Sequence, residues 1–547
     1  MLKSNQNKVT LPSAKTLFSI TLSLLSLGVF AQKPNPSATS EKFATLLYYI
    51  ENAYVDTVNA EKLTEKAIVA LLEELDPHSV YLSKEELQEA NEPLNGSFDG
   101  VGIQFNIFHD TILVVEPIQG GPSEKLGIRA GDKIVTIEGE MVAGIGIKNN
   151  DVLKKLRGPK GTKVNVGIER SGSKELIAYS ITRDKIPIYS LDAAYLVSPG
   201  IGYIKISRFA KTTMEELRTA IGELKNEGMK DLILDLQGNG GGFLNTAVEM
   251  CDEFLSGDKL LVYTEGTHFR REDHKANPTV QGSFEKGRLV VLIDESSASA
   301  SEILSGAIQD WDRGLIVGRR SFGKGLVQRP VSLPDGSAVR LTVQKYYTPS
   351  GRCIQKPYDD GLDAYLSDKE KRFKNGEYFS LDKLDLPDSL KYYTNNKKRV
   401  VFGGGGILPD VFVPLDTTDN SAYFSEMLRT GVNNDWVLSY VNTNREMLLA
   451  QYPNIDSFMK GYSVPASGLK EMIKMLEDKK VPYNDEEYKR SEGSIIIRTK
   501  ALIARNLYDN ESFFMVINAL NPAMLKAVDI LKDGSFEKAN LAHKEFK

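Results

Sequence analysis

Cysteine is scarce in this chain, and so is histidine. The two cysteines, Cys251 and Cys353, are too few for a disulfide framework or for a zinc site built from four cysteines. The five histidines are scattered, with no pair spaced to bind a metal from one helix face. Histidine-based catalysis therefore has few candidates, and we expect neither a metal nor another cofactor.

An excess of positive charge is also missing. The 68 lysines and arginines are outnumbered by 73 aspartates and glutamates, which gives a formal net charge of −5. This balance excludes a generally basic nucleic-acid-binding protein, so we expect no nucleic-acid partner. The 45 glycines and 22 prolines are ordinary amounts, which excludes collagen-like and wholly disordered chains. A chain of 547 residues suffices for three or four globular units.

The first 31 residues have the pattern of a secretory signal peptide. Three lysines and no acidic residue accompany the apolar run Leu17–Phe30. This run is shorter than the roughly 20 residues that span a bilayer, and the small residues Val29 and Ala31 suit a cleavage site. An uncleaved anchor is the alternative. We expect cleavage and an exported protein, either periplasmic or associated with the cell envelope.

Hydrophobic periodicity divides the rest of the chain into five segments. Residues 32–95 carry apolar side chains at helical spacing, and residues 96–185 hold short β-type runs broken by Gly and Pro. Strands and helices alternate in residues 186–355, which is typical of a largely parallel sheet covered by helices. We expect residues 356–419 to form an insertion and a return strand, and residues 420–547 to be helical.

The β-rich segment contains a glycine turn before a strand, Gly100-Val101-Gly102-Ile103. Successive N–H groups in such a turn can bind an anion, and the strand after it can offer an edge to an extended peptide. A plain turn is the alternative. The surrounding residues, which include GGPSEKLGIRAGDKIVTIEGE, resemble a PDZ domain. This resemblance implies that a free, apolar C-terminus binds at these four residues and against the helix that starts near Asp151.

Four serines lie within Ser296–Ser301, between an apolar strand and a helix. Serines at such a junction commonly cap the helix by accepting hydrogen bonds from its free N–H groups, which is one interpretation. The junction also suits a nucleophile, because the N–H groups of the helix start can stabilise an oxyanion.

A base for such a serine can come from Lys324, which lies between two glycines after the apolar run LIVG. Burial lowers the pKa of a lysine, and a neutral lysine accepts a proton. A solvated loop lysine is the alternative. Gln328 is placed four residues later, where it can orient the amine. The glycine turn Gln237–Gly242 ends another strand, and its N–H groups can approach an oxyanion closely.

The stretch SASASEILSGAIQDWDRGLIVGRRSFGKGLVQ resembles the active-site region of the C-terminal processing peptidases, or tail-specific proteases. KYYTPSGRCIQ (345–355), ALLEELDPHSVYL (70–82) and GGGGILPDVFVP (403–414) match the same family. The resemblance implies a multidomain α/β protein. Its parts are a crotonase-like α/β protease core, an inserted β-rich PDZ domain, an N-terminal helical segment and a C-terminal helical region.

The same resemblance implies roles for individual residues. It makes Ser299 the nucleophile, Lys324 the base, Gln328 the support of the lysine, and the backbone N–H groups of Ala300 and Gly241 the oxyanion donors. Two departures from the family pattern lie in the glycine turn, where Gln237 and Gly240 stand in place of the usual arginine and proline. The glycine at position 240 loosens the turn that holds an oxyanion donor, and the glutamine at position 237 removes a charge. Neither departure affects the proposed nucleophile or base.

The expected function is that of an exported serine endopeptidase of the Ser/Lys dyad type. Its PDZ domain is expected to recognise the C-terminal tail of protein substrates with free apolar C-termini. Arg157, beside the helix that flanks the peptide groove, is a candidate sensor of bound ligand, and a plain surface arginine is the alternative. An adaptor protein and self-association through the N- or C-terminal helices are further expectations.

Three other interpretations stay open at this stage. A non-catalytic peptide-binding scaffold would keep the PDZ pocket without needing Ser299 or Lys324. A Ser-His-Asp protease would recruit one of the histidines, although none lies in a convincing triad context. A crotonase-like acyl-transfer enzyme would share the alternating strands and helices and the glycine turn, but a PDZ module suits a small acyl substrate less well.

Overall fold

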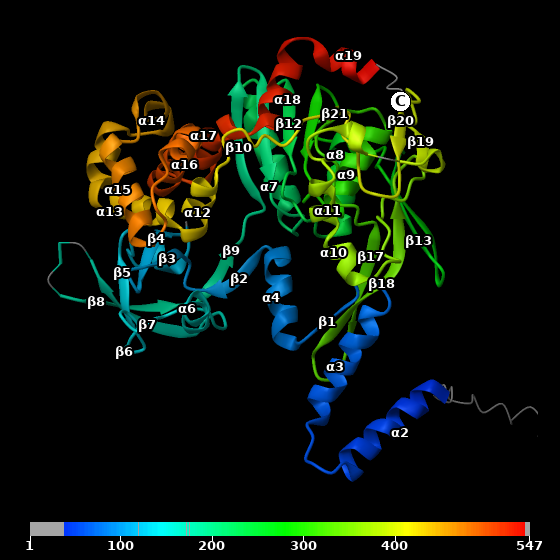
Figure 1. Cartoon of the computed structure of the whole chain (residues 1–547), viewed down its shortest axis with the longest axis horizontal. Coiled ribbons are helices and arrows are strands. Elements are labelled where there is room, and N and C mark those ends of the chain that lie inside the picture. The colour runs from blue at the N-terminus through cyan, green and yellow to red at the C-terminus, as the bar shows by residue number, and fades with distance from the viewer. Residues whose placement is uncertain (1–37, 119, 171, 174, 385, 542–547) are drawn as a thin grey trace, which may run out of the picture. The chain divides into compact units, whose positions relative to one another are not determined.

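The computed structural model describes residues 38–541, except for residues 119, 171, 174 and 385. The predicted signal peptide, residues 1–31, lies outside the described residues. The chain divides into two compact units, one ending at Leu71 and the other beginning at Leu72. Figure 1 shows the order of the elements along the chain.

The first unit is helical in its described part. It holds α2 (Ala38–Ala53) and most of α3 (Ala60–Glu73). No side chain of α2 is buried, and four of its large apolar side chains are exposed: Phe43, Leu46, Tyr48 and Tyr49. These four side chains therefore lie on the surface of this unit.

The β-rich segment folds around its own apolar core. Its sheet has the order β3-β4-β5-β7-β8 with β6 beside β5, all pairings are antiparallel, and β3 forms one edge. A separate pair, β2 and β9, joins the two ends of the segment. Its elements are β2 (Ser97–Gly100), β3 (Ile103–Phe108), β4 (Thr111–Pro117), α5 (Pro122–Lys125), β5 (Lys133–Ile137), β6 (Glu140–Met141), α6 (Asn149–Leu156), β7 (Lys163–Glu169), β8 (Ile177–Thr182) and β9 (Asp184–Pro187).

A six-stranded sheet in the order β10-β11-β12-β15-β16-β21 forms the centre of the second unit. Neighbouring strands are parallel from β11 onward, while β10 and β11 are antiparallel, which confirms the predicted α/β core. Its elements are β10 (Leu191–Ser198), β11 (Ile201–Ile206), α7 (Thr213–Asn226), β12 (Asp231–Asp235), α8 (Leu244–Phe254), β15 (Leu289–Ile293), α9 (Ala300–Asp310), β16 (Leu315–Gly318) and β21 (Val411–Phe412). Every residue of β15 and β16 is buried, as expected for strands covered on both faces.

Helices from distant parts of the chain cover the two faces of this sheet. Side chains of α7, α8 and α9 pack on one face in the largest apolar core. The other face is covered by α18 (Pro522–Lys532) and α19 (Ser535–Leu541), whose Met524, Ile530 and Phe536 pack against Tyr203, Val290 and other strand residues. Figure 1 shows these last helices next to the central strands.

A second, antiparallel sheet lies in the order β1-β18-β13-β14, with β17 also beside β18. Its strands are β1 (Val80–Leu82), β13 (Leu260–Gly266), β14 (Phe269–Lys275), β17 (Leu326–Ser332) and β18 (Ala338–Tyr347). The strand β1 interrupts the segment expected to be helical, 32–95, because Pro77 ends the helical pattern and Val80 then pairs with Arg340. This pairing holds the turn Asp76–Ser79 beside β18.

The insertion after residue 355 is built from short elements. They are α10 (Leu362–Leu366), α11 (Asp368–Lys374), two 3-10 turns (Leu381–Lys383 and Asp388–Leu390), β19 (Lys391–Tyr393) and β20 (Val400–Phe402). The chain then returns to the central sheet as β21. The insertion is anchored by buried charges, since Arg372 donates to Glu377 at 2.9 Å and to the backbone carbonyl of Ser321 at 3.0 Å.

The C-terminal helical region consists of two packing units. The first has its own apolar core, and its helices are α12 (Ala422–Thr430), α13 (Val432–Gln451), α14 (Ile455–Gly461), α15 (Ala466–Asp478) and α16 (Asp485–Leu507). The second, α18 with α19, packs on the central sheet. The helix α17 (Asn510–Ile517) joins the two units, because its Val516 packs in the first core and its Phe514 packs against the sheet. Among the described helices, no single one is long and apolar enough to cross a membrane, although the bent pair Asn510–Leu520 and Pro522–Lys532 meets that criterion by length and composition.

Candidate active site

The serine segment and the glycine turn follow neighbouring strands of the central sheet. β12 and β15 are parallel and pair Asp235 with Leu292, so the loops that follow them lie at the same edge of the sheet. The two loops are hydrogen-bonded to each other, since the N–H of Ala298 donates to the carbonyl of Asn239 at 3.0 Å. Residues some 60 positions apart thus form one surface.

Ser299 is held in an unusual backbone conformation at the start of α9. Its φ of 57° and ψ of −113° are rarely adopted by a residue with a side chain, and such strain persists where surrounding contacts impose it. The residue is half-buried and lines a cavity of about 590 Å³. Other residues that line this cavity are Phe243, Ile303, Gln328, Tyr346 and His274.

The carboxylate of Glu302, one turn into α9, organises the loops around it. This side chain is fully buried, and its Oε2 accepts hydrogen bonds from the N–H groups of Ser299 (2.8 Å) and Lys324 (2.9 Å). Its Oε1 accepts from the N–H of Gly323 (2.7 Å) and from Ser321 Oγ (2.5 Å). Burial raises the pKa of Glu302 to about 7, against the opposing effect of these hydrogen bonds.

Tyr346 links the same two residues from another side. Its hydroxyl contacts the backbone carbonyl of Ser299 at 3.1 Å and also that of Lys324. Both the N–H groups and the carbonyls of Ser299 and Lys324 therefore share partners. The structure thus places the backbones of Ser299 and Lys324 in one hydrogen-bonded cluster. Ser299 lines the cavity described above, while Lys324 is not among the residues that line it.

Lys324 lies in the loop between β16 and β17 and is half-buried. Its pKa is lowered from the usual 10.5, first by burial and then by the positive charge of Arg340, while Glu302 and Asp76 act in the opposite direction. The flanking glycines permit close packing, since a Cβ at Gly325 would lie 2.8 Å from the backbone N of Gln355. Burial and the nearby Arg340 charge both favour the neutral form of the amine.

The turn from Asp76 to Ser79 packs beside this lysine. Asp76 Oδ1 accepts from the N–H groups of His78 (2.8 Å) and Ser79 (2.9 Å), and His78 Nε2 makes a 2.7 Å hydrogen bond with the hydroxyl of Tyr365. Burial, followed by the charge of Lys324, lowers the pKa of His78 to about 4. His78 is therefore a neutral neighbour of the lysine at physiological pH.

Gln328 reaches this turn through a threonine. Its Nε2 donates to Thr342 Oγ1 at 3.3 Å, and Thr342 Oγ1 donates to Asp76 Oδ1 at 3.0 Å. From its position four residues after Lys324, Gln328 was predicted to orient the lysine amine. In this structure the hydrogen bond of its amide nitrogen goes to Thr342, and its side chain lines the cavity beside Ser299.

The two nominated oxyanion donors differ in their surroundings. Ala300 is the first residue of α9, where the N–H has no partner within the helix and lies at the positive end of the helix dipole. The N–H of Gly241, in contrast, donates to Asn239 Oδ1 at 2.8 Å. Gly242, the next residue, lines the cavity. The Gly241 N–H is thus committed inside the turn in this structure.

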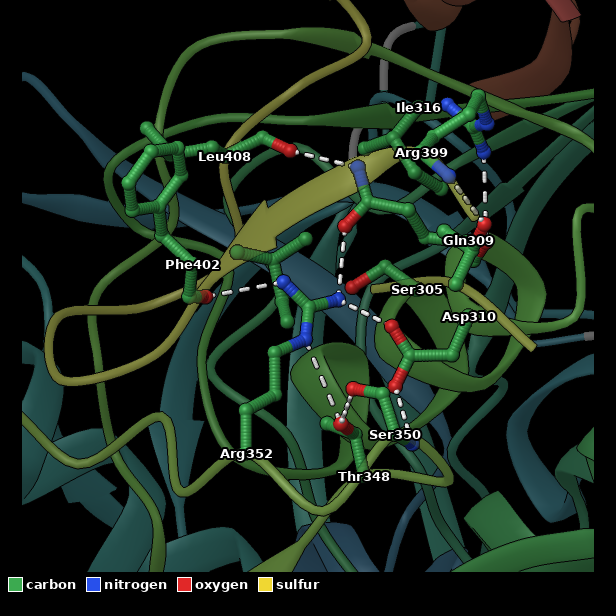
Figure 2. Close-up of polar contacts among 12 residues, drawn as sticks. Ser305, Gln309, Asp310, Ile316, Thr348, Ser350, Arg352, Arg399, Phe402 and Leu408 are labelled. Carbon is green, nitrogen blue, oxygen red and sulfur yellow. Dashed lines mark hydrogen bonds and ion pairs between the residues drawn. The ribbon is translucent and has the colours of Figure 1, made fainter. Parts of the chain in front are cut away.

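The far end of α9 is fixed by buried charges, which Figure 2 shows. Arg352 is fully buried and donates to Asp310 Oδ1 (2.7 Å) and Gln309 Oε1 (2.8 Å). It also donates to the carbonyl of Phe402 at 3.0 Å. Arg399 donates to the carbonyl of Gln309 at 3.3 Å. Positive charge at a helix C-terminus is favourable, so these arginines stabilise the helix whose first residues hold Ser299.

The predicted peptide-binding loop of the β-rich domain lies at the open edge of its sheet. Gly100 ends β2, Val101 is buried, Gly102 has a φ of 73°, and Ile103 begins the edge strand β3. The carbonyls of Val101 and Gly102 accept hydrogen bonds from Ser123 and Ile118 within the same domain. An extended ligand can add to β3 from this side.

Arg157 follows α6 and contacts the helix before this domain. Its guanidinium makes a 2.6 Å ion pair with Glu92 of α4 (Lys84–Asn95) and lies 4.5 Å from the ring centre of Phe98. About a third of the arginine side chain is exposed. Arg157 therefore contacts both Phe98 of the β-rich domain and Glu92 of α4.

Comparison with known proteins identifies these parts. Residues 200–363 match peptidase family S41, and residues 113–170 match the PDZ domain. The chain is 34% identical to the carboxy-terminal processing protease CtpB of Bacillus subtilis over 351 residues, 64% of this chain and 70% of that protein. It belongs to the carboxy-terminal processing proteases of peptidase family S41.

Two further proteins are similar to this chain. A carboxy-terminal-processing protease of Bartonella bacilliformis is 36% identical over 324 residues, which is 57% of this chain and 72% of that protein. A solved structure of a photosystem II D1 C-terminal processing protease is 31% identical and covers 58% of this chain and 91% of its own, with a TM-score of 0.33. The helices in residues 423–509 of this protease match a family of unknown function.

Several residues of this protease were not nominated from the sequence. Five such residues hold the nominated site residues or their loops in place by hydrogen bonds. They are Glu302, Tyr346, Asn239, Asp76 and Thr342. The stretches that begin SASASE and ALLEELDPHS contain Glu302 and Asp76, but no pattern in the sequence indicated that the second stretch packs beside Lys324. Only the pairing of β1 with β18 brings it there.

Proposed function

We propose that this protein is a serine endopeptidase in which Ser299 is the nucleophile and Lys324 is the general base. The observation that carries this proposal is the single carboxylate oxygen of Glu302, which accepts from the N–H groups of both residues. The lowered pKa of Lys324 supports it, since a neutral amine is needed to take the proton of Ser299.

The proposed reaction proceeds through an acyl-enzyme. Ser299 Oγ attacks the carbonyl carbon of the scissile peptide bond while Lys324 Nζ accepts the hydroxyl proton. The N–H of Ala300 and an N–H of the glycine turn stabilise the oxyanion. For Gly241 to serve as that second donor, its hydrogen bond to Asn239 has to open. Lys324 then protonates the leaving amine, and water hydrolyses the ester, so that no metal or cofactor is required.

The PDZ domain is proposed to select the substrate. A free, apolar C-terminus would bind its carboxylate at Gly100–Ile103 and add its last residues as a strand to β3. The Arg157–Glu92 ion pair is the contact through which occupancy of this groove would be sensed by α4. A plain structural ion pair is the alternative role for Arg157, and Arg157→Ala with unchanged tail-stimulated turnover would support that alternative.

Matched variants test the dyad. We expect Ser299→Ala, Lys324→Ala and Lys324→Arg each to lower cleavage of a fluorogenic peptide with a free apolar C-terminus by about a thousandfold or more. Arginine fails because it cannot lose its proton. Full activity of the purified Ser299→Ala or Lys324→Ala protein would refute the assignment. The same peptide with an amidated C-terminus separates tail recognition from bond cleavage, because it lacks the carboxylate that the PDZ loop would bind.

A serine–histidine mechanism has one specific observation in its favour. His274 lines the same cavity as Ser299, and its Nε2 is buried without a hydrogen-bond partner. No carboxylate is hydrogen-bonded to His274 within the described part of the chain, which leaves a triad incomplete. We therefore expect His274→Ala to retain the activity that Lys324→Ala loses, and the opposite pattern would make His274 the base.

Export and the partner proteins are further parts of the proposal. The N-terminal signal pattern supports export to the periplasm or cell envelope, which N-terminal sequencing of the mature protein from fractionated cells would test. Protein substrates with apolar C-termini, an adaptor, and self-association through the helices are the proposed partners. Sequencing the new chain ends formed by active and Ser299→Ala protein among exported proteins would identify substrates.

A further inference from the structure

The residue that begins the glycine turn, Gln237, is held by three separate hydrogen bonds. Its N–H donates to Asp235 Oδ1 at 2.8 Å, and its carbonyl accepts from the buried amine of Lys205. Its side-chain oxygen accepts from Asn521 Nδ2 at 2.8 Å. The first two partners belong to the strands of the central sheet, but Asn521 comes from the far end of the chain.

Asn521 occupies the N-cap position of α18. Its Oδ1 accepts from the N–H of Met524 at 3.2 Å, while its Nδ2 reaches Gln237. The helix behind it is firmly seated, because Ala523, Met524 and Ala527 are buried against the central sheet. The cap is thus a fixed point from which the side chain contacts the turn.

The turn that Gln237 begins is in contact with the nucleophile segment. The carbonyl of Asn239 accepts from the N–H of Ala298 at 3.0 Å and from Ser301 Oγ at 2.9 Å. A Cβ added at Gly241 would lie 2.8 Å from that of Ser299. A small displacement of the turn therefore changes the distance between its N–H groups and the reacting carbonyl, and oxyanion stabilisation depends strongly on that distance.

We propose that Asn521 is a positioning residue for catalysis, through which the C-terminal helix α18 fixes the oxyanion turn beside Ser299. The inference rests on the proposed serine peptidase function. It adds a role in turnover to a segment that lies outside the residues matching the peptidase family. The hydrogen bond between Asn521 and Gln237 is the contact that carries it.

Two substitutions separate this contact from the stability of the helix. Asn521→Ser keeps a good N-cap but is too short to reach Gln237, and Gln237→Leu removes the acceptor without touching α18. We expect each to lower kcat about tenfold with KM little changed, since transition-state positioning is lost while ground-state binding is kept. The affinity for a peptide boronate, which mimics the tetrahedral state, should fall in parallel.

Asn518→Ala is the matched control. Asn518 also links the C-terminal segment to the central sheet, by a 2.8 Å hydrogen bond to the hydroxyl of Tyr195, but Tyr195 belongs to β10 rather than to the turn. We expect this variant to lose stability without the specific fall in kcat. Thermal unfolding of all variants separates a folding defect from a catalytic one.

A double-mutant cycle gives the decisive outcome. If the contact acts as a unit, Asn521→Ser with Gln237→Leu lowers kcat no more than either change alone. Unchanged kcat in both single variants, or strictly additive losses, would overturn the inference. Failure of this inference is distinguishable from failure of the proposed function. If Ser299→Ala is inactive while Asn521→Ser and Gln237→Leu are fully active, only the positioning role is refuted.

Discussion

Gly241 packs so closely against Ser299 that a Cβ at position 241 would come within 2.8 Å of the serine Cβ and 3.0 Å of the Ala300 nitrogen. Its φ of +103° is also unsuited to a side chain. We expect Gly241→Ala to lower kcat/KM at least a hundredfold by pushing apart the nucleophile and the oxyanion donors, as measured with the fluorogenic peptide. Gly240→Ala, where a Cβ meets no atom within 4 Å, is the control that should stay active.

Replacing Glu302 by glutamine should uncouple the two site loops. Two carboxylate oxygens of Glu302 now accept these hydrogen bonds, whereas a glutamine has only one accepting oxygen. Each buried donor that loses its partner lowers the free energy of unfolding by about 1–3 kcal/mol. We expect a lower unfolding temperature together with loss of most activity. Glu370→Gln, which weakens an exposed ion pair with Lys374, should change both quantities little. Normal turnover by Glu302→Gln would show that the shared carboxylate does not hold the pair.

Cleavage should decline in acid because Lys324 must be uncharged to accept a proton. The pKa of Lys324 lies below its usual value of 10.5, so the active fraction is largest above that lowered pKa and decreases as the pH falls through it. The pH profile of kcat/KM reports this value for the free enzyme. The positive charge of Arg340 lowers the pKa of Lys324. Arg340→Gln removes this charge, so we expect the lysine pKa to rise and the acid limb of the profile to move to higher pH. A profile that is flat into mildly acidic pH would argue against a lysine base.

His78 should make folding stability sensitive to pH between about 4 and 6.5. The pKa of His78 is lowered to about 4 in the folded protein from 6.5, so only the unfolded chain takes up the proton in this window, and stability falls as the pH falls. After allowance for partial exposure, the loss amounts to about 1–2 kcal/mol. Urea unfolding at pH 6.5 and 4.5 should show a smaller pH effect in His78→Gln. An identical pH effect in the two proteins would contradict this assignment.

The buried Arg352–Asp310 pair should behave differently from surface ion pairs. Arg352→Met leaves a fully buried carboxylate without its charge partner, which costs about 3–5 kcal/mol. The double change Arg352→Met with Asp310→Leu should cost less than the sum of the single changes, as thermal unfolding would measure. Arg429→Met, which breaks an exposed pair with Glu426 on α12, should leave the unfolding temperature unchanged.

Much of this architecture could be predicted because it depends on patterns within short stretches of the sequence. The alternation of apolar strands and helices predicted the central sheet, and the serine and lysine motifs lie in two loops that the Glu302 carboxylate joins. The glycine at position 241 indicated a close approach of two backbones, and its Cα lies against Ser299. These features depend on residues near one another in the sequence, where periodicity and turn chemistry are informative.

The remaining features depend on contacts between distant residues. The turn at Asp76 belongs to a segment expected to be helical, and only the pairing of Val80 with Arg340 brings it beside Lys324. The expected contact between Gln328 and the lysine amine gave way to one with Thr342, because β17 and β18 pair these two residues across the hairpin. The commitment of the Gly241 N–H to Asn239 likewise depends on a side-chain orientation that spacing cannot reveal.

The seating of α18 and α19 on the central sheet has a consequence for how the protein unfolds. One face of the strands that precede Ser299 and the glycine turn is covered by helices from a distant part of the chain. Detaching these helices would expose the apolar side chains of that face to water, which is costly in free energy. We therefore expect the helices and the sheet to unfold in one transition, in which both loops lose the framework that holds them.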